Sequence, residues 1–239
     1  MIGPGSPYWV ATNSSAFSPL AIGGVELFVE ADNVTEAAGG VSVWGDQGSS
    51  GNDLLQGTEG NRPGLVSSWR NSRPALSFNG TTHFLRIAAL ANGSLSQSYT
   101  IVLVGSWDND NGTGPFAVAS AATAFGVRHQ GGDPTLSTGA NFNSGTSAPA
   151  SGTAFVMLAE ANSSSSKIRF EGHGVAVQNA TGNAGTGGLV GVTVGGYGSG
   201  SALWAEHIAA VAIYSKVLSD AQKDQLFTHF KNRYAIVPL

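Results

Sequence analysis

Acidic residues at close spacing are the first candidates for chemistry in this sequence. Glu26 and Glu30 lie in the segment VELFVE, where positions i and i+4 share one face of a strand. A retaining glycosidase needs two carboxyl groups about 5–5.5 Å apart. Phe28 separates the pair on that face, and the chain contains no E-x-D-x-E run. We therefore expect the two glutamates at a solvent-facing strand edge and no enzymatic activity, unless two distant carboxylates converge in space.

The segment DNDNGTG (108–114) suggests a calcium ion, which binds carboxylate and carbonyl oxygens. In an EF-hand pattern that starts at Asp108, however, Gly112 stands at position five and Ala119 at position twelve, so this register fails. Asp108 and Asp110 could still be ligands of a lectin-type calcium. The alternative, which we favour, is a polar hairpin turn without a metal ion.

The loop that contains Asp46, Asn52 and Asp53 leaves the same two alternatives open. One is a calcium site, and the other is that Asp46 accepts hydrogen bonds from backbone amides and shapes the loop. The five histidines are dispersed, without the H-x-H or H-x-x-x-H spacing of metal ligands. The chain also lacks the G-x-S-x-G motif of serine hydrolases. The sequence therefore predicts no metal and no cofactor.

Three aromatic residues are candidates for binding a sugar. A carbohydrate site needs an exposed aromatic ring beside polar hydrogen-bonding groups. Trp69, Trp107 and Tyr197 lie at or near predicted loops. The alternative for each of them is packing in the core or against a loop. The ligand of such a site would be a cell-surface glycan.

The composition narrows the possible partners. Only 11% of the 239 residues are charged, well below the roughly 25% of ordinary soluble domains. The surface must therefore be rich in serine, threonine, asparagine and glycine, as in proteins that face the outside or pack against copies of themselves. The eleven basic residues form no cluster, so no nucleic-acid partner is expected. No run approaches the ~18 apolar residues of a membrane helix, so no membrane partner is expected.

Residues 1–24 form a predicted N-terminal arm without a charged residue. The arm also lacks the basic start and the apolar stretch of a secretory signal. Tyr8, Trp9 and Phe17 are its aromatic anchors, and three prolines stiffen it. Proline lowers the entropy that a segment loses when it becomes ordered. We therefore expect the arm to bind another subunit, or a lattice of subunits, through these three aromatic residues. The alternative is that the arm wraps around its own sandwich.

The rest of the chain, 25–239, is predicted to be one all-β domain. About twelve short strands alternate with turns rich in glycine, serine and asparagine, and so many strands curl into two sheets. An apolar strand is predicted over 202–215, and a long loop over 131–152. A hairpin joins two further strands and is expected to set Glu160 opposite Arg169 as a cross-strand ion pair.

One helix is predicted, and it closes the chain. Ser219 and Gln222 have the spacing of a capping box, in which each residue satisfies a backbone amide of the first turn. Leu226, Phe230 and Tyr234 then recur every four residues and form an apolar face. Runs of strands closed by a single helix predict a two-sheet sandwich with a helix across it.

Two segments resemble a known family. One is the stretch from LFVEADNV through VWGDQGSSGNDLLQ to NSRPALSFNGTTHFLRI. The other is the ending AEHIAAVAIYSKVLSDAQKDQLFTHFKNRYAI. Both resemble the laminin-G-like group within the concanavalin A-like lectin/glucanase superfamily. The matching positions in the first stretch are Trp44, Asp46, Gln47, Gly51, Asn52, Pro74, Ala75, Leu76, Phe78, Gly80 and Leu85. The resemblance implies a jelly-roll sandwich of two antiparallel sheets with one C-terminal helix.

The resemblance leaves the function open, because this fold occurs in lectins, glycosidases, adhesion modules and virion proteins. Domains of this type are frequent in bacteriophage structural proteins. Because the chain begins at Met1 without an export signal but has the polar surface of an extracellular protein, the leading hypothesis is a non-enzymatic virion subunit. It would decorate a capsid or belong to the tail of a phage-like particle, with other virion proteins and copies of itself as partners. The alternative is a carbohydrate-binding module or adhesin that recognises cell-surface glycans at the extracellular surface.

Overall fold

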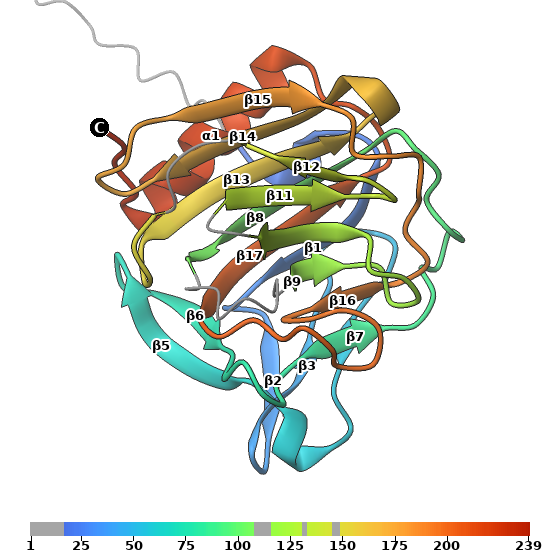
Figure 1. The fold of residues 1–239 in the computed structure, drawn as a ribbon. Coiled ribbons are helices and arrows are strands. Elements are labelled where there is room, and N and C mark those ends of the chain that lie inside the picture. Colours follow the sequence, from blue (N-terminus) through green and yellow to red (C-terminus); the bar gives the residue numbers. More distant parts are fainter. Residues whose placement is uncertain (1–16, 108–115, 131–132, 145–148) are drawn as a thin grey trace, which may run out of the picture.

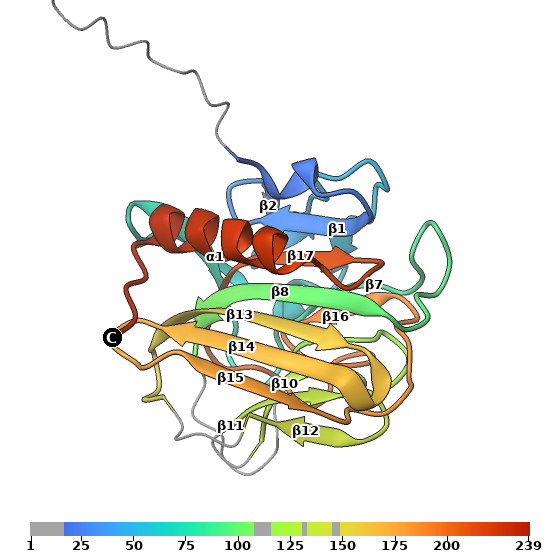
Figure 2. The ribbon, with the colours of Figure 1, turned by 90° about the horizontal axis from the view of Figure 1, so that it is seen from above.

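The structure is a computed structural model that describes residues 17–107, 116–130, 133–144 and 149–239. Seventeen strands, three short 3₁₀ helices and one α-helix lie within them. The strands form two antiparallel sheets, and a helix lies across one of these (Figures 1 and 2). This arrangement confirms the all-β jelly-roll sandwich with one C-terminal helix. In the described part of the chain, no helix is long and apolar enough to span a membrane.

The first sheet has eight strands in the order β15-β14-β13-β8-β17-β6-β5, and β1 pairs with β17 beside β6. Its long central strands, β8, β13 and β17, pair in antiparallel register, which is unbroken between β8 and β13 and shifts between Ile208 and Ala210 on β17. The strands are β1 (Val25–Glu30), β5 (Gly64–Arg70), β6 (Arg73–Ser77), β8 (Tyr99–Ser106), β13 (Ala154–Ala161), β14 (Ser166–Gly172), β15 (Gln178–Gly182) and β17 (His207–Tyr214).

The second sheet has nine shorter strands in the order β12-β11-β10-β9-β16-β7-β4-β3-β2. The strands are β2 (Val34–Ala37), β3 (Gly40–Trp44), β4 (Leu54–Leu55), β7 (Leu85–Ile87), β9 (Phe116–Ala119), β10 (Gly126–Gln130), β11 (Asp133–Ser137), β12 (Asn141–Asn143) and β16 (Val192–Val194). The short helices are η1 (Pro19–Ala21), η2 (Glu59–Asn61) and η3 (Ser163–Ser165).

Both faces of the first sheet are buried. On β8, Ile101 and Leu103 belong to the core between the sheets, whereas Val102 and Val104 belong to a second core beneath the helix. This division follows from the strand period of two. The strand is therefore apolar throughout, and all eight of its residues are buried. The first sheet consequently has no free face over its centre for a ligand.

The helix α1 (Asp220–Tyr234) covers the outer face of the first sheet (Figure 2). It begins as predicted: the Ser219 hydroxyl accepts from the Gln222 amide at 3.3 Å, and the Gln222 side chain accepts from the Ser219 amide at 2.9 Å. Its predicted apolar face is also confirmed, because Leu226, Phe230 and Tyr234 are all buried against the sheet.

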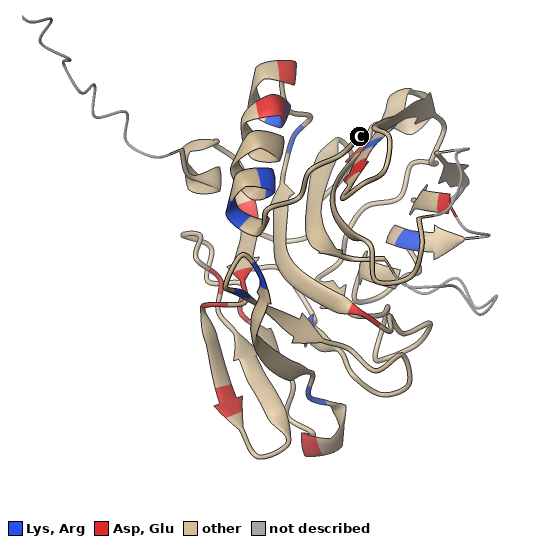
Figure 3. Cartoon of the chain, turned by 90° about the vertical axis from the view of Figure 1, so that its left-hand side faces the viewer, with Lys and Arg blue, Asp and Glu red and all other residues tan. Residues whose placement is uncertain are grey.

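Ion pairs join basic residues of α1 to buried acids of the first sheet, and Figure 3 marks the charges along the helix and on the strands. Each acid contributes a carboxylate that is at most 8% exposed, so the helix supplies the charge that its burial requires. The pairs are Lys223–Glu160 at 2.9 Å, Lys231–Glu171 at 2.6 Å and Arg233–Glu30 at 2.6 Å. The expected solvent-facing position of Glu30 is therefore wrong, because α1 covers it.

Three local sequence predictions are also wrong. The described part of 131–152 is not one loop, since it contains β11 and β12, whose Leu136 and Phe142 join the core. The predicted strand 202–215 begins only at His207. In the β13–β14 hairpin, Lys167 and not Arg169 lies opposite Glu160, because η3 lengthens the connection.

Part of the predicted arm packs on its own sandwich. Residues 17–24 are described, and η1 within them is capped by the Ser18 hydroxyl. Ile22 is buried in the core beneath α1, and the Tyr214 hydroxyl donates to the Pro19 carbonyl at 3.2 Å. Tyr8 and Trp9 lie outside the described residues, so their predicted role as anchors stays a prediction.

Candidate functional site

Trp107 is a core residue and offers no face to a glycan. It follows β8 directly and is 1% exposed. Its ring meets the edge of His129 at 4.6 Å and packs on Phe155 and Trp204 at 5.8 and 6.1 Å. Bulky rings packed edge to face fill the space between the two sheets. We therefore remove Trp107 from the candidate carbohydrate-binding residues.

Trp69 is half-buried at the end of β5, where it packs the sheet edge against the last turn of α1. Its ring stacks on His207 with the centroids 6.0 Å apart and packs on Tyr234 at 5.9 Å. The guanidinium of the next residue, Arg70, donates to the Ala235 carbonyl at 2.8 Å. These contacts occupy the ring from two sides. Trp69 therefore has a structural role in this arrangement, and it is a poor platform for a sugar.

A polar cluster that sequence reasoning missed lies beneath Trp69. Glu206 accepts from the Ser106 hydroxyl at 2.9 Å and lies 3.0 Å from Nδ1 of His207. Burial alone would raise the pKa of Glu206, but the hydrogen bonds from His207 and Ser106 outweigh it and lower the pKa. Glu206 and His207 are adjacent in sequence, a spacing that carries no motif, so the sequence gives no signal for the cluster.

This cluster is not arranged as a catalytic triad. In a triad the base contacts the serine through one ring nitrogen and the acid through the other. Here Nδ1 of His207 faces both Ser106 and Glu206, and Ser106 is 1% exposed. The cluster therefore lacks the geometry of a triad, and Ser106 is buried away from solvent.

Tyr197 lies on the outer side of the second sheet, the side that faces away from α1. It is half-buried, and its ring meets the edge of Phe116 on β9 with the centroids 5.4 Å apart. The turn that carries it closes on itself, since Tyr197 and Ser201 form an isolated bridge and Thr193 donates to the Gly198 carbonyl at 2.8 Å. Tyr197 is thus the one of the three predicted aromatic residues that borders a sheet face not covered by α1.

Next to Tyr197, four outward-facing side chains form a row across four neighbouring strands. The antiparallel register aligns Phe116 with Arg128, Arg128 with Thr135, and Thr135 with Asn143. Strands lie about 4.8 Å apart, so the row is about 14 Å long. The intervening positions on these strands point into the core, as Val127 and Leu136 do. We call Tyr197 and this row the outer-face row.

The outer-face row combines the half-buried ring of Tyr197, which packs on the buried Phe116, with hydrogen-bonding groups. The Arg128 guanidinium lies 5.2 Å from the centre of the Phe116 ring and donates to Gln130 on the same strand. The Thr135 hydroxyl donates to the Asn143 side chain at 3.0 Å, and Asn143 itself is exposed. Guanidinium and amide groups supply several donors and acceptors in fixed directions. The segment FGVRHQ indicates a strand by sequence but not a binding role.

The loop of Asp46, Asn52 and Asp53, for which the sequence left a calcium site as one alternative, has a structural role. Asp46 accepts from the amides of Phe28, Gly48 and Asn52, each at 2.9 Å. Its carboxylate oxygens are therefore occupied by donors, as expected for a residue that shapes a loop. In the part of the chain that the structure describes, no group of three or more acidic or histidine side chains could hold a metal ion. Asp108 and Asp110 lie outside that part.

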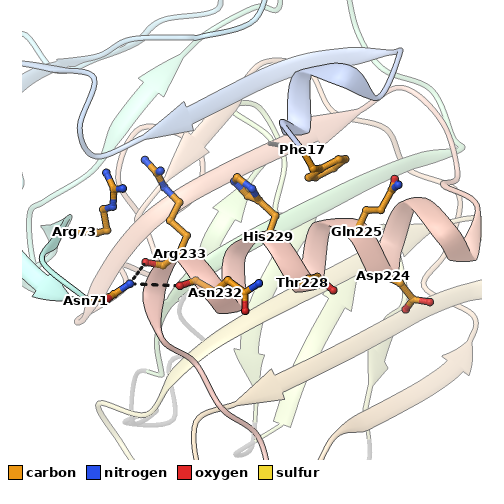
Figure 4. Close-up of a pocket in the computed structure, with 9 residues that line it drawn as sticks. All are labelled: Phe17, Asn71, Arg73, Asp224, Gln225, Thr228, His229, Asn232 and Arg233. Carbon is orange, nitrogen blue, oxygen red and sulfur yellow. Dashed lines mark hydrogen bonds between the residues drawn. The ribbon is translucent and has the colours of Figure 1, made fainter. Parts of the chain in front are cut away.

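A groove lies on the opposite side of the molecule, between α1, the residues that precede η1 and the turn from β5 to β6 (Figure 4). Its volume is about 630 Å³, and most of its wall is carbon. Phe17 lies above α1 between His229 and Gln225 and packs edge to face on His229, with the ring centroids 5.6 Å apart. The lining residues are Phe17, Asn71, Arg73, Asp224, Gln225, Thr228, His229, Asn232 and Arg233.

Solved structures with a similar fold include carbohydrate-active proteins. The Trypanosoma rangeli sialidase in complex with the inhibitor DANA superposes with a TM-score of 0.58 and 15% identity over 87% of this chain. Domain 4 of AbnA, a GH43 extracellular arabinanase from Geobacillus stearothermophilus, in complex with arabinotriose, gives 0.56 and 14% over 85% of this chain. The binding domain of Paraclostridial Mosquitocidal Protein 1 gives 0.61 and 10% over 87%.

The extent of these matches limits what they show. The chain spans about a third of the sialidase chain (33%) and 53% of the mosquitocidal protein's binding domain, but it spans 98% of AbnA domain 4. At such low identities the likeness shows a shared fold alone. No protein-family model matches the chain, and no curated protein matches it.

Proposed function

We propose that this chain is a non-catalytic carbohydrate-binding module that recognises glycans through the outer-face row. The observation that carries the proposal is the alignment of Phe116, Arg128, Thr135 and Asn143 beside the half-buried ring of Tyr197. Sugars present both apolar C–H faces and hydroxyl groups, so a ring bordered by fixed donors and acceptors suits them. The first sheet offers no comparable surface, because α1 covers it.

The members of the row have different parts in this proposal. Phe116 and Thr135 are buried, whereas Tyr197 and Arg128 are half-buried and Asn143 is exposed. A ligand would therefore contact the last three side chains. Phe116 supports the Tyr197 ring and the Arg128 guanidinium from below, and Thr135 orients Asn143 through its hydrogen bond.

The similar solved structures support the same class of function. AbnA domain 4 was solved with arabinotriose, and it is matched over almost its whole length. An arabinofuranosidase complexed with arabinofuranosyl-alpha-1,2-xylobiose also shares the fold over 81% of this chain. A short arabinose- or xylose-containing oligosaccharide is therefore the first probe to try, with sialic acid as the second.

We infer that the module lacks hydrolytic activity of its own. Glycoside hydrolysis uses two carboxyl groups that flank the scissile bond. In the described strands β9 to β12, the one carboxylate is Asp133, which lies opposite Gln130 beside the row. The buried glutamates of the first sheet are held in ion pairs with α1 and lie on the other side of the molecule. A single carboxylate beside the row supports binding and not cleavage.

The proposal is tested by measuring glycan binding with calorimetry, using arabinotriose and sialic acid as soluble probes after a glycan-array screen. Tyr197→Ala and Arg128→Gln should each weaken binding about tenfold or more, because each removes at least one contact worth about 1.4 kcal/mol. Leu55→Ala is the matched control, since Leu55 lies on the same sheet and is 52% exposed but is remote from the row. Its affinity should equal that of the wild type.

Two outcomes would contradict the proposal. One is a wild-type protein that binds no glycan on the array. The other is binding that survives both substitutions unchanged while circular dichroism shows both variants folded. Location in a virion, and virion proteins as partners, remain predictions. The low charge content and the uncharged arm motivate them, and incorporation into purified particles would test them.

A further inference from the structure

The groove beside α1 has the size and lining of a surface that could bind a protein segment. Its wall is mainly carbon, and its volume of about 630 Å³ lies within the range of sites that hold a small ligand or a few side chains. Thr228 and Asn232 on its floor are exposed, and Arg73 on its rim is 47% exposed. Phe17, the first described residue, lies above α1 between His229 and Gln225 (Figure 4). Sixteen further residues of the chain therefore precede a residue of the groove wall.

We propose that Trp9, in the N-terminal segment of a second copy of this chain, fills the groove, so that two copies exchange their arms. The segment 1–16 is uncharged, and it contains Pro7, Tyr8 and Trp9 in succession. Large aromatic residues inserted into pockets dominate the energy of protein interfaces. Each copy would give one arm and receive one, which is the arrangement of a closed two-fold dimer.

The chemistry of the groove suits an indole ring. The ring of His229 hydrogen-bonds to the backbone of Phe17, while its Nε2 has no hydrogen-bond partner in the part of the structure described. Because Nε2 is itself buried, His229 offers an indole the uncovered part of its half-buried ring, an aromatic contact. The exposed guanidinium of Arg73 can lie over the indole face, a favourable cation–π contact.

The reach of the arm favours a second copy over the same copy. From Gln225 to Arg233 the groove follows eight residues of α1, about 12 Å at 1.5 Å per residue. An arm that continued straight along its own groove would place only residues 13–16, Asn-Ser-Ser-Ala, in it, and these side chains are too small to fill it. Trp9 stands eight residues before Phe17, a span of up to about 26–29 Å when extended. That length is sufficient to cross to a neighbouring molecule.

Cysteine trapping tests the proposal directly, because the natural chain contains no cysteine. In the double variant Val10→Cys with Thr228→Cys, the first thiol neighbours Trp9 and the second lies in the groove. Mild oxidation should give a disulfide-linked dimer on a non-reducing gel, with the peptide that joins positions 10 and 228 found by mass spectrometry. The matched control is Val10→Cys with Ser199→Cys, since Ser199 is equally exposed but lies on the turn that carries Tyr197. It should give no such cross-link.

Light scattering provides the second measurement. The wild type should be a dimer at micromolar concentration, and Trp9→Ala should weaken self-association about 30-fold or more, the effect of losing a hot-spot residue. The melting temperature of the dilute monomer should not change. A cross-linked monomer in the trapping experiment would overturn the exchange, because the arm would then dock on its own chain. Absence of the cross-link, or a Trp9→Ala dimer as tight as the wild type, would overturn it as well.

Discussion

The ion pair between Lys223 on α1 and Glu160 on β13 allows a quantitative test of how the helix is attached. The Lys223 nitrogen lies 2.9 Å from a Glu160 oxygen, and the two side chains are 10% and 1% exposed. Burial would lower the pKa of Lys223, but its hydrogen bonds to Glu160 and Asp220 raise it. Lys223→Met keeps the length of the side chain and removes the charge. It would leave the Glu160 carboxylate buried and unpaired.

The size of the loss follows from leaving a buried charge without its partner. Breaking a buried ion pair by removing one partner costs about 3–5 kcal/mol in general, because the remaining charge stays buried and uncompensated. Lys223→Met should therefore lower the free energy of unfolding at pH 7 by about 3–5 kcal/mol.

Urea unfolding, followed by tryptophan fluorescence at pH 7, measures this loss. Lys167→Met is the matched control, because Lys167 lies opposite Glu160 in the β13–β14 register but is exposed. It should change the free energy of unfolding by at most about 0.5 kcal/mol. Glu160→Leu combined with Lys223→Met should recover most of the loss, because an apolar pair replaces a buried ion pair at little cost. A loss for Lys223→Met no larger than that for Lys167→Met would refute the reasoning.

Three further predictions concern the helix, the polar cluster and calcium. Phe230→Ala should lower the free energy of unfolding by about 3–5 kcal/mol, measured by urea midpoints, because its buried ring packs on Phe28. The lowered pKa of Glu206 means that its stabilisation is present above the ordinary value of 4.5 and is lost as pH falls through the lowered value. Glu206→Gln should therefore flatten acid unfolding below pH 4.5, followed by circular dichroism. Calcium should not shift the melting temperature, and a rise reversed by chelator would restore Asp108 and Asp110 as ligands.

The features that sequence predicted correctly are those that short-range rules determine. The capping box of Ser219 and Gln222 and the apolar spacing of Leu226 and Phe230 depend only on positions within one helix. The loop around Asp46 is also determined mainly by local contacts. Its carboxylate accepts the nearby amides of Gly48 and Asn52 as well as the distant amide of Phe28. Local hydrogen bonds of this kind are visible in a single sequence.

The features that sequence could not predict depend on which elements become neighbours. Trp107 and Tyr197 are both aromatic residues near turns, and only the pairing of the sheets places one in the core and the other on an outer face. The partner of Glu160 is a lysine 63 positions further along the chain and not the expected cross-strand arginine. Strands β11 and β12 were missed because each contributes a single large core side chain, Leu136 or Phe142, among small polar residues.

The two proposed surfaces lie on opposite sides of the sandwich. The groove follows α1 on the outer face of the first sheet, and the outer-face row lies on the outer face of the second sheet. A dimer joined through the groove would therefore leave both rows free. Two linked sites on one particle or cell surface raise the effective affinity without any new contact. On the proposed model, weak binding by a single half-buried tyrosine and a few polar groups would then be sufficient, because two linked rows act together.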